Sequence, residues 1–315
     1  MFKNKEYVLM VYKEKSFSKA AKKLYISQPS LSASVKRIED KLGAPIFDRS
    51  TQPVSLTEIG EEYIRYAQGM EEKEQDFSRY VADHTQLLAG TVRLGGSSLF
   101  SSFILPSIIM DFVKEYPRIH FEITEDNTKN LMEKLSQGEL DLVVDNAIIN
   151  DENISSQIYT NEQLLLAVPS HLPVNEKLKS CALTAKDIKA GKHKKSPCYA
   201  DLTAFADEQF IFLNPENDTG KRASRLFKKY GLKPHVIYYL DQQVTSYNIA
   251  GFGLGIAFVS DTLIKYMGED PYLKYYLMAD SEMTRNIYFY TKNSHYLSFA
   301  CQRFLDFTLE KKRNS

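Results

Sequence analysis

Residues 16–49, SFSKAAKKLYISQPSLSASVKRIEDKLGAPIFDR, have the pattern of two helices joined by a tight turn. Ser27 is a good N-cap for the second helix, and Pro29 falls in its first turn, where no backbone N–H is needed. Gly43 marks the end of that helix. Apolar residues recur at helical spacing and would form a shared core: Phe17, Ala20, Ala21 and Leu24 in the first helix, and Leu31, Val35, Ile38 and Leu42 in the second.

The opposite face of the second helix carries the polar side chains Gln28, Ser30, Ser32, Lys36 and Arg37, together with the small Ala33. The amide and the hydroxyls can form hydrogen bonds with base edges, whereas the two cations can reach phosphates. This arrangement predicts a helix-turn-helix whose second helix reads DNA. From this segment alone, the alternative is an ordinary two-helix corner of a bundle with a solvated serine face.

The distribution of charge favours DNA binding. The chain of 315 residues has 40 Lys or Arg and 40 Asp or Glu. Residues 1–60 hold eleven of the basic and six of the acidic residues, a net charge of +5, which leaves a net charge of −5 for residues 61–315. The neutral total therefore hides a basic N-terminal part on an acidic body, as expected of a protein that holds nucleic acid at one end.

Three runs between Phe17 and Gly60 together resemble the N-terminal signature of LysR-type transcriptional regulators. They are A-A-x-x-L-x-x-S-Q-P-S-L-S, I-E-D-K-L-G-A-P-I-F-D-R and V-S-L-T-E-I-G. The resemblance implies a winged helix-turn-helix, a linker helix that dimerises, and an effector domain built like a periplasmic binding protein. It also implies that Gln28, Pro29 and Ser32 enter the major groove. Arg49 and Thr51 would lie in the wing, near the minor groove or the DNA backbone.

The pattern and the resemblance together predict the residues that contact DNA. They are Ser27, Gln28, Pro29, Ser30, Ser32, Ala33, Lys36, Arg37, Arg49 and Thr51. Two positions depart from the family's pattern: Ala33 stands where many members have Arg, and Gln52 stands where many have a basic residue. These departures affect base preference rather than the mode of docking.

A second segment, from about Thr57 to Leu88, predicts one long helix that begins at an N-cap and has acidic residues in its first turn. Its apolar residues follow a heptad-like spacing: Ile59, Tyr63, Tyr66, Met70, Phe77, Val81, His84 and Leu88. A rod of about 31 residues cannot bury such a stripe within one small domain, so the segment favours dimerisation. A long helix packed on its own body is the alternative. Paired recognition helices would read a roughly palindromic operator.

From Gly90 onward, strand and helix patterns alternate, which predicts α/β structure. We expect three parts: a winged helix-turn-helix over residues 1–58, a linker helix over 59–89, and a two-lobed α/β effector domain over 90–315. The first lobe would comprise about 90–160 and 266–315, and the second about 161–265. The chain would cross between the lobes near 146–163 and 259–272. The last helix, about 296–309, would fold back onto the first lobe.

Ligands of parallel α/β sheets lie at the carboxyl ends of strands and at helix N-termini. The residues at such places are Ser97, Ser98 and Thr128 in the first lobe and Asn214, Glu216, Asp218 and Thr219 in the second. We take Ser97, Ser98, Thr128, Asn214, Glu216 and Thr219 as candidate effector contacts. Ordinary helix capping is the alternative for all of them. The acidic Glu216 and Asp218 would disfavour a multiply charged anion or pair with an amino group on the ligand.

Several other features restrict the class of protein. The sequence contains no stretch of 18 apolar residues, so no membrane span is expected. Charges interrupt the apolar N-terminus, so no secretory signal is expected. Three scattered cysteines (Cys181, Cys198 and Cys301) suit a reducing cytoplasm better than a disulfide scaffold. The glycines at 251, 253 and 255 precede a strand, the reverse of a phosphate loop. The basic run 191–195 predicts a solvated surface loop, with a mobile cover beside the cleft as the alternative.

These features favour a ligand-responsive, cytoplasmic transcription regulator over two other classes. A solute-binding protein would carry an export signal and lack the basic head, and no Ser-His-Asp motif or metal-ligand spacing supports an enzyme. The expected partners are double-stranded DNA, a small effector (an organic acid or an amino acid) and further copies of the chain as a homodimer or homotetramer. RNA polymerase is a candidate partner. No cofactor, metal or membrane is expected.

Overall fold

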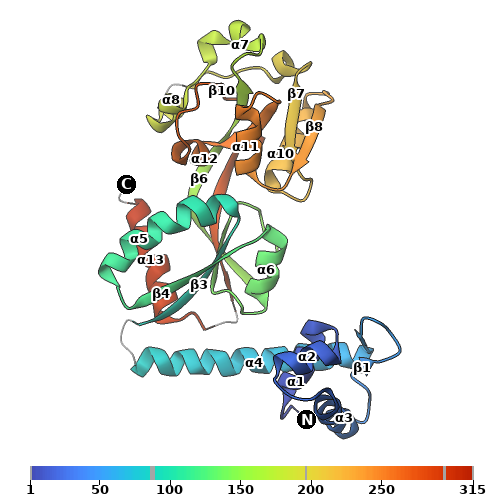
Figure 1. Cartoon of the computed structure of the whole chain (residues 1–315). Coiled ribbons are helices and arrows are strands. Elements are labelled where there is room, and N and C mark those ends of the chain that lie inside the picture. Colours follow the sequence, from blue (N-terminus) through green and yellow to red (C-terminus); the bar gives the residue numbers. More distant parts are fainter. Residues whose placement is uncertain (1, 86–88, 196, 294–295, 314–315) are drawn as a thin grey trace. The chain divides into compact units, whose positions relative to one another are not determined.

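The computed structural model describes residues 2–85, 89–195, 197–293 and 296–313 (Figure 1). It divides into two compact units, Met1–Ala82 and Asp83–Ser315, and we describe each by itself. Within the described residues, no helix combines the length and the apolar character needed to cross a bilayer.

The first unit is a small helical bundle with a two-stranded wing. Its elements are α1 (Lys5–Glu14), α2 (Phe17–Lys23), α3 (Gln28–Leu42), β1 (Phe47–Asp48), β2 (Ser55–Leu56) and α4 (Glu58–Thr85). The predicted apolar positions Ala20, Ala21, Leu31, Val35 and Ile38 are buried, whereas Phe17, Leu24 and Leu42 are partly buried against the same core. The predicted helix-turn-helix is therefore confirmed, and the antiparallel pair β1–β2 supplies the wing.

The turn between α2 and α3 has the predicted capping. The hydroxyl oxygen of Ser27 accepts a hydrogen bond from the backbone N–H of Ser30 at 3.3 Å, and Pro29 lies in the first turn of α3. Tyr25 occupies the left-handed region (φ 56°) between the helices, and Gly43 ends α3 at φ 78°. These two residues set the directions in which the chain enters and leaves α3.

Helix α4 confirms the predicted long helix, but its heptad-spaced apolar residues do not all lie on one exposed face. Tyr63 is buried in the core of the first unit, stacked on Phe2 with ring centroids 4.9 Å apart, so it does not belong to an exposed seam. The side chains of four other stripe residues are exposed, Phe77 most of all at 67%: Ile59, Tyr66, Met70 and Phe77. Val81 is exposed too, whereas the side chains of His84 and Leu88 lie outside the described residues.

The second unit contains two α/β lobes that share one path of strands. The first lobe is built from β3 (Gly90–Gly96), η1 (Phe100–Ile104), α5 (Leu105–Glu115), β4 (Ile119–Glu125), α6 (Thr128–Ser136), β5 (Leu142–Asp145), β11 (Thr284–Lys292) and α13 (Phe299–Arg313). The second contains η3 (Leu202–Phe205), β7 (Gln209–Leu213), α10 (Asp218–Lys229), β8 (His235–Leu240), α11 (Gln243–Gly251), β9 (Ile256–Ser260), α12 (Asp261–Tyr266) and β10 (Leu273–Tyr276). Between them runs β6 (Ile154–Pro169), which belongs to both.

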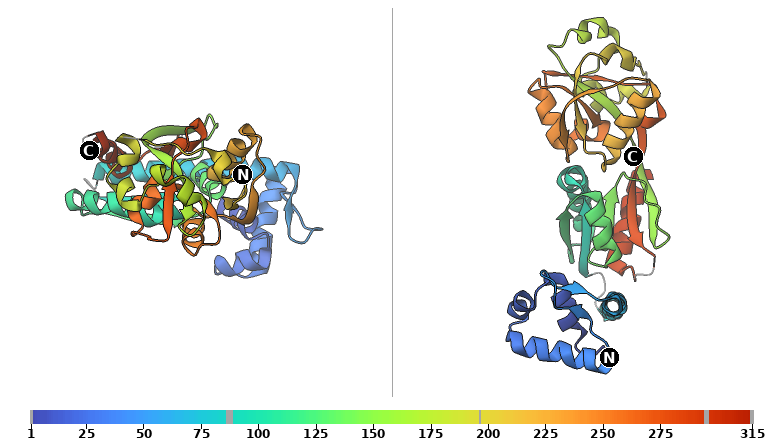
Figure 2. Two further views of the ribbon diagram at one scale, coloured as in Figure 1. Left: turned by 90° about the horizontal axis from the view of Figure 1, so that it is seen from above. Right: turned by 90° about the vertical axis from the view of Figure 1, so that its right-hand side faces the viewer.

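Helices cover both faces of the strands in each lobe (Figures 1 and 2). Leu142 and Val144 pack in a cluster with residues of α5 and α13, whereas Val143 between them packs with Leu131 and Leu135 of α6. Successive strand residues point to opposite faces, so this alternation places the helices on opposite sides of β5. Helix α13 returns to the first lobe as predicted, and Phe304 packs against Phe112 and Phe121.

Strand β6 carries the chain from one lobe to the other. Its residues 154–163 pair with β11, whereas residues 164–167 pair with β9 and residues 166–169 pair with β10. The return crossing differs from the prediction of 259–272. Because β10 pairs with the second-lobe part of β6, the chain returns between β10 and β11, through η4 (Ser281–Met283). The lobe boundary expected at residue 266 therefore moves toward the C-terminus.

A buried ionic cluster joins the elements at the crossing. Arg285 of β11 donates from Nε to Glu162 of β6 at 2.7 Å, and from Nη1 to Asp218 of α10 at 2.9 Å. The side chains of Arg285 and Glu162 are 1% and 0% exposed, and Glu162 Oε2 has no hydrogen-bond partner among the described residues. Burial opposes the charge of Arg285, but the neighbouring carboxylates of Glu162 and Asp218 outweigh it and raise the pKa of the guanidinium.

The structure differs from the sequence-based expectation at the cysteines and at the basic run 191–195. Cys181 and Cys198 form a disulfide, and Cys301 is buried in α13, so the expectation that the cysteines would not pair is wrong for two of them. Residues 191–195 do not form a solvated loop. They contribute the short helix α9 (Lys192–Lys195), and His193 is buried. They are also not among the residues that line the cleft described below.

The close approach of α4 to the β1 segment generates a first prediction. A Cβ at Gly60 would lie 2.0 Å from the backbone carbonyl oxygen of Ile46, so Gly60→Ala must push α4 away. We expect this substitution to lower the free energy of unfolding of the first unit by about 1–3 kcal/mol. Chemical denaturation followed by circular dichroism measures the change.

Gly69 supplies the matched control on the same helix. A Cβ at Gly69 would meet nothing within 4 Å, and alanine is the better helix former, so Gly69→Ala should be neutral or stabilise by up to about 1 kcal/mol. Equal effects of the two substitutions would contradict the close approach at Gly60.

The ionic cluster at the crossing generates a second prediction. Arg285→Met leaves the buried Glu162 without its cation, so we expect the free energy of unfolding of the second unit to fall by about 3–5 kcal/mol. Arg225→Met is the control, since Arg225 pairs with Glu282 at 2.8 Å but is 52% exposed. Its loss should cost no more than about 1 kcal/mol. If Arg285→Met is as stable as Arg225→Met, the cluster does not hold the crossing.

Candidate DNA-binding surface and effector cleft

The exposed face of α3 presents the residues predicted to contact DNA. Gln28, Pro29, Ser30, Ala33, Lys36 and Arg37 are exposed, and so is Ser27 at the N-cap; Ser32 is partly buried. Leu31, Val35 and Ile38 bury the opposite face, so the register of α3 is determined by its core contacts. Lys36 and Arg37 have no carboxylate partner among the described residues, which leaves both cations available for phosphates.

Arg49 is held against α3 rather than extended from the wing. Its guanidinium forms an ion pair with Glu39 at 2.9 Å, donates to Ser32 Oγ at 3.2 Å, and lies 4.9 Å from the ring centroid of Phe17. Glu39 Oε1 also accepts the backbone N–H groups of Ile46 and Phe47. Glu39 thus connects α3 to the start of the wing, a structural role that the sequence pattern did not indicate.

Thr51 shapes the turn of the wing. Its hydroxyl lies 2.8 Å from the hydroxyl of Ser55 and accepts the backbone N–H of that residue at 3.2 Å. It also donates to the carbonyl oxygen of Asp48 at 3.2 Å. Nearby, the hydroxyl and backbone N–H of Ser50 donate to the carboxylate of Asp48 and lower its pKa. The wing turn is therefore tied internally, in part by Thr51, which the sequence analysis assigned to DNA.

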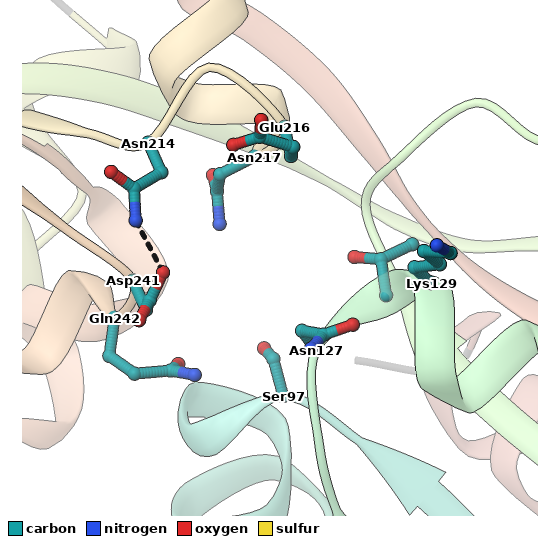
Figure 3. A pocket seen from close by; sticks show the side chains of 9 residues that line it. Ser97, Asn127, Lys129, Asn214, Glu216, Asn217, Asp241 and Gln242 are labelled. Carbon is teal, nitrogen blue, oxygen red and sulfur yellow. Dashed lines mark hydrogen bonds between the residues drawn. The ribbon is translucent and has the colours of Figure 1, made fainter. Parts of the chain in front are cut away.

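A cavity of about 250 Å³ lies between the lobes of the second unit (Figure 3). Every residue that lines it is polar or charged: Ser97, Asn127, Thr128 and Lys129 from the first lobe, and Asn214, Glu216, Asn217, Asp241 and Gln242 from the second. These residues follow β3, β4, β7 and β8, or begin the helices after three of these strands. The carboxyl ends of the parallel strands therefore meet at this cleft, as the sequence analysis expected.

Four of the six candidate effector residues line the cavity, namely Ser97, Thr128, Asn214 and Glu216. Ser98 and Thr219 are not among its lining residues, so the structure does not bring these two to the cavity. Thr219 is buried within α10, where its hydroxyl accepts a hydrogen bond from Arg285 at 2.9 Å. The neighbouring Gly220 allows this burial of Thr219, since a Cβ at position 220 would lie 2.4 Å from the carbonyl oxygen of Leu213. Helix α10 therefore begins directly against the end of β7.

Sequence reasoning missed five lining residues: Asn127, Lys129, Asn217, Asp241 and Gln242. Asp241 and Gln242 directly follow β8 and precede α11, so the rule that singled out Asn214 after β7 applies to them equally. Asn127 and Asn217 are the N-caps of α6 and α10, and each accepts a hydrogen bond from a backbone N–H of its helix. Their position at a helix start was the available signal.

The charges in the cleft are divided between the lobes. Lys129 on the first-lobe side and Glu216 on the second-lobe side have no ion-pair or hydrogen-bond partner within the part of the chain that the structure describes. Asp241 accepts a hydrogen bond from the side-chain amide of Asn214 (Figure 3). The cleft therefore offers one cation on one side and two carboxylates on the other, with amides and hydroxyls between them.

The first-lobe wall is held from behind by a buried acid. Thr128 donates from its hydroxyl to Asp145 at 2.9 Å, and the backbone N–H groups of Asn146 and Ala147 donate to the same carboxylate. Burial raises the pKa of Asp145, and these hydrogen bonds oppose the rise. Asp145 thereby ties the start of α6 to the end of β5.

Both units match known protein families. Residues 2–61 match the model of the bacterial regulatory helix-turn-helix protein of the lysR family, and residues 85–186 and 195–313 match the LysR substrate binding domain. The chain is 26% identical over 310 residues to the transcriptional regulator YcgK of Bacillus subtilis, covering 98% of this chain and 94% of that protein. It is also 29% identical over 258 residues to the regulator BenM of Acinetobacter baylyi, covering 80% and 78%.

Solved structures show the same fold along the whole chain. Full-length CbnR complexed with its target DNA matches with a TM-score of 0.64 at 16% identity, covering 99% of both chains. The relatives are transcriptional regulators rather than enzymes. With a helix-turn-helix on one unit and an inter-lobe cleft in the other, the chain belongs to the LysR family of DNA-binding, ligand-responsive transcriptional regulators.

Proposed function

We propose that this regulator works as a homo-oligomer whose paired α3 helices read a roughly palindromic operator, and that a small amino-bearing metabolite in the cleft modulates it. Three parts divide the work, as the sequence analysis expected: the winged helix-turn-helix binds DNA, α4 joins subunits, and the second unit binds the effector. The observation that carries the DNA-binding part is the polar face of α3 with its exposed cations Lys36 and Arg37.

Helix α4 supports oligomerisation through its exposed apolar residues. Ile59, Tyr66, Met70 and Phe77 are all at least 41% exposed within a single chain, although such side chains ordinarily pack against a partner. Their spacing suits a second copy of the same helix better than a solvated surface. A two-fold pair of chains would place two recognition helices in successive major grooves and so favour a palindromic site.

The cleft supports an effector of the size and charge of an amino acid. A cavity of about 250 Å³ is smaller than the usual range for drug-sized ligands, and its wholly polar lining favours a polar molecule. Asp241 and Glu216 suit an ammonium group, and Lys129 with the N-terminus of α6 suits a carboxylate. The effector-binding domain of QuiR, a structure with 19% identity, has been solved in complex with shikimate, so this fold can hold a small polar acid.

Regulation follows if the effector favours one arrangement of the lobes. A ligand that touches both walls of the cleft binds the closed arrangement more tightly than the open one and shifts the population toward it. We propose that this shift rearranges the oligomer, changes the spacing of the DNA-binding heads and alters access of RNA polymerase to the promoter.

Two substitutions on α3 separate base reading from phosphate binding. Gln28→Ala should reduce discrimination between a duplex selected by the wild-type protein and a random duplex by about 1–3 kcal/mol. Lys36→Ala should weaken binding to both duplexes alike and reduce the slope of log K against log salt by about 1. Fluorescence anisotropy at several salt concentrations measures both.

Lys177→Ala is the control for the loss of a positive charge, because Lys177 is exposed on α7 (Val174–Lys177) of the second unit. It should leave both the discrimination and the salt slope unchanged. If Lys36→Ala has the salt slope of the wild type, Lys36 does not contact DNA. If Gln28→Ala discriminates between the two duplexes as well as the wild type does, Gln28 does not read a base.

Asp241→Asn tests the ammonium site. We expect several of the standard α-amino acids to raise the thermal midpoint of the full chain, and their deaminated carboxylic acids to do so far less. The substitution should weaken the binding of the most tightly bound amino acid about 10- to 100-fold, since it removes a charge-assisted hydrogen bond worth about 1.5–3 kcal/mol. Isothermal titration calorimetry gives the dissociation constants.

Asp207→Asn, at an exposed acid outside the cleft lining, should bind the amino acid as the wild type does. Equal affinity of an amino acid and its deaminated analogue would exclude the ammonium site, while leaving the DNA-binding function intact.

A further inference from the structure

Residues 187–194 lie outside the two segments that the family model of the effector domain matches, and we call this stretch the addition. The family model matches the chain up to residue 186 and again from residue 195, so it leaves out exactly this stretch of eight positions. The structure folds the stretch into the end of α8 (Ala185–Lys189) and most of α9. Lys192 binds back to Asp187 at 2.6 Å, which closes the turn between these two helices. The addition is thus a structured element.

The addition reaches the crossing between the lobes through His193. The His193 side chain is fully buried, and its Nε2 lies 3.0 Å from the carboxylate of Asp261 at the start of α12. The other oxygen of that carboxylate accepts the backbone N–H of Gln163 at 2.9 Å. Gln163 is the residue at which β6 passes from pairing with β11 to pairing with β9. One carboxylate therefore connects the addition to the crossing strand.

The charges around Asp261 make this contact strong. Lys194 and Lys265 each place Nζ 3.1 Å from Asp261, which is itself 1% exposed. Burial opposes the charge of this carboxyl, but the hydrogen bond with His193 and the two lysines outweigh it and hold its pKa below the usual range. Without His193 and Lys194, both from the addition, the buried carboxylate would keep Lys265 and the Gln163 amide as its partners within the described part of the chain.

The disulfide encloses the addition. Cys181 and Cys198 are 17 positions apart, and their Cα atoms are 5.1 Å apart. Cys198 is exposed and Cys181 partly so, which leaves the bond accessible to thiols, whereas Cys301 is buried in α13. Backbone hydrogen bonds join Leu183, which lies within the disulfide-closed loop, to Tyr275. They also join Ala200, which lies two residues after Cys198, to Leu277. The bond therefore closes the base of a loop that carries His193.

We propose that Cys181 and Cys198 are a reversible oxidation site that sets how firmly the addition holds the lobe crossing. DNA-binding proteins work in compartments that keep most thiols reduced, and a disulfide there is typically a redox-sensing one. In the oxidised form the closed loop holds His193 on Asp261. Reduction removes the covalent closure and leaves the base of the loop held by the backbone hydrogen bonds of Leu183 and Ala200, so the loop gains conformational entropy and releases His193 more often.

The chemistry is thiol–disulfide exchange with a low-molecular-weight disulfide. The thiolate of one cysteine attacks that disulfide, forming a mixed disulfide and releasing one small thiolate. The second cysteine then attacks the mixed disulfide, forming the Cys181–Cys198 bond and releasing the second small thiol. The protein loses two electrons and two protons, which the two released thiols carry. A small dithiol reverses the sequence.

The first experiment counts thiols in the full-length protein equilibrated in defined ratios of reduced and oxidised dithiothreitol. After denaturation and alkylation, mass spectrometry should find one alkylated cysteine in the oxidised protein, Cys301, and three in the reduced protein. Cys181 and Cys198 should change together across the series. Three alkylated cysteines in the fully oxidised buffer would overturn the proposal.

The second experiment measures what the bond does to the crossing. Trypsin should cut at Lys192, Lys194 and Lys195 roughly tenfold faster after reduction, since cleavage follows the population of the opened loop. Hydrogen exchange at the Gln163 amide should accelerate by a similar factor, whereas exchange in β3 should not change. Equal cleavage and exchange in the two redox states would overturn the proposal even if the bond forms.

Variants separate the bond from the contact it supports. The double variant Cys181→Ser/Cys198→Ser should behave as the reduced protein in every buffer, and Cys301→Ser as the wild type. His193→Ala, with the disulfide intact, should accelerate exchange at Gln163 in the oxidised protein. If His193→Ala exchanges as slowly as the oxidised wild type, the bond does not act through this contact. None of these measurements depends on the identity of the effector.

Discussion

A single strand, β6, forms backbone hydrogen bonds with both lobes of the effector unit, and the rest of that unit depends on this sharing. Its first part pairs with β11 and its last part with β9 and β10, so neither lobe has a complete sheet without it. Charged side chains form hydrogen bonds with the two residues of β6 at which its pairing changes from one lobe to the other. Arg285 joins Glu162 to Asp218 on one side, and Asp261 accepts the Gln163 amide on the other.

This constraint also creates the cleft. Because the strands β3, β4, β7 and β8 all end toward the crossing, the loops that follow them meet there with polar side chains. Helices α6 and α10 begin at these loops and are fixed from behind, α6 through Thr128 on Asp145 and α10 through Asp218 on Arg285. The second-lobe wall is therefore attached to Arg285, one of the buried groups that join the lobes, whereas the first-lobe wall is attached to Asp145 of its own lobe.

The helix-turn-helix was the part most open to prediction, because its signals are local. Capping by Ser27, the Pro in the first turn and the four-residue spacing of Leu31 and Val35 each act within one or two turns of helix. The long helix was predicted for the same reason. The burial of Tyr63 was not, because a heptad spacing shows which residues share a face but not which bundle that face meets.

The sequence by itself determined the order of elements, the exposed polar face of α3 and four of the cleft residues, since each follows from periodicity, capping or position after a strand. Only the tertiary structure decided what depends on contacts between distant segments. These contacts bury Thr219 under Arg285, hold Arg49 on Glu39, pair Cys181 with Cys198, and place His193 on Asp261. The physical reason is that a charge or a thiol is satisfied by whichever partner the folded chain brings near it, and sequence spacing does not record that distance.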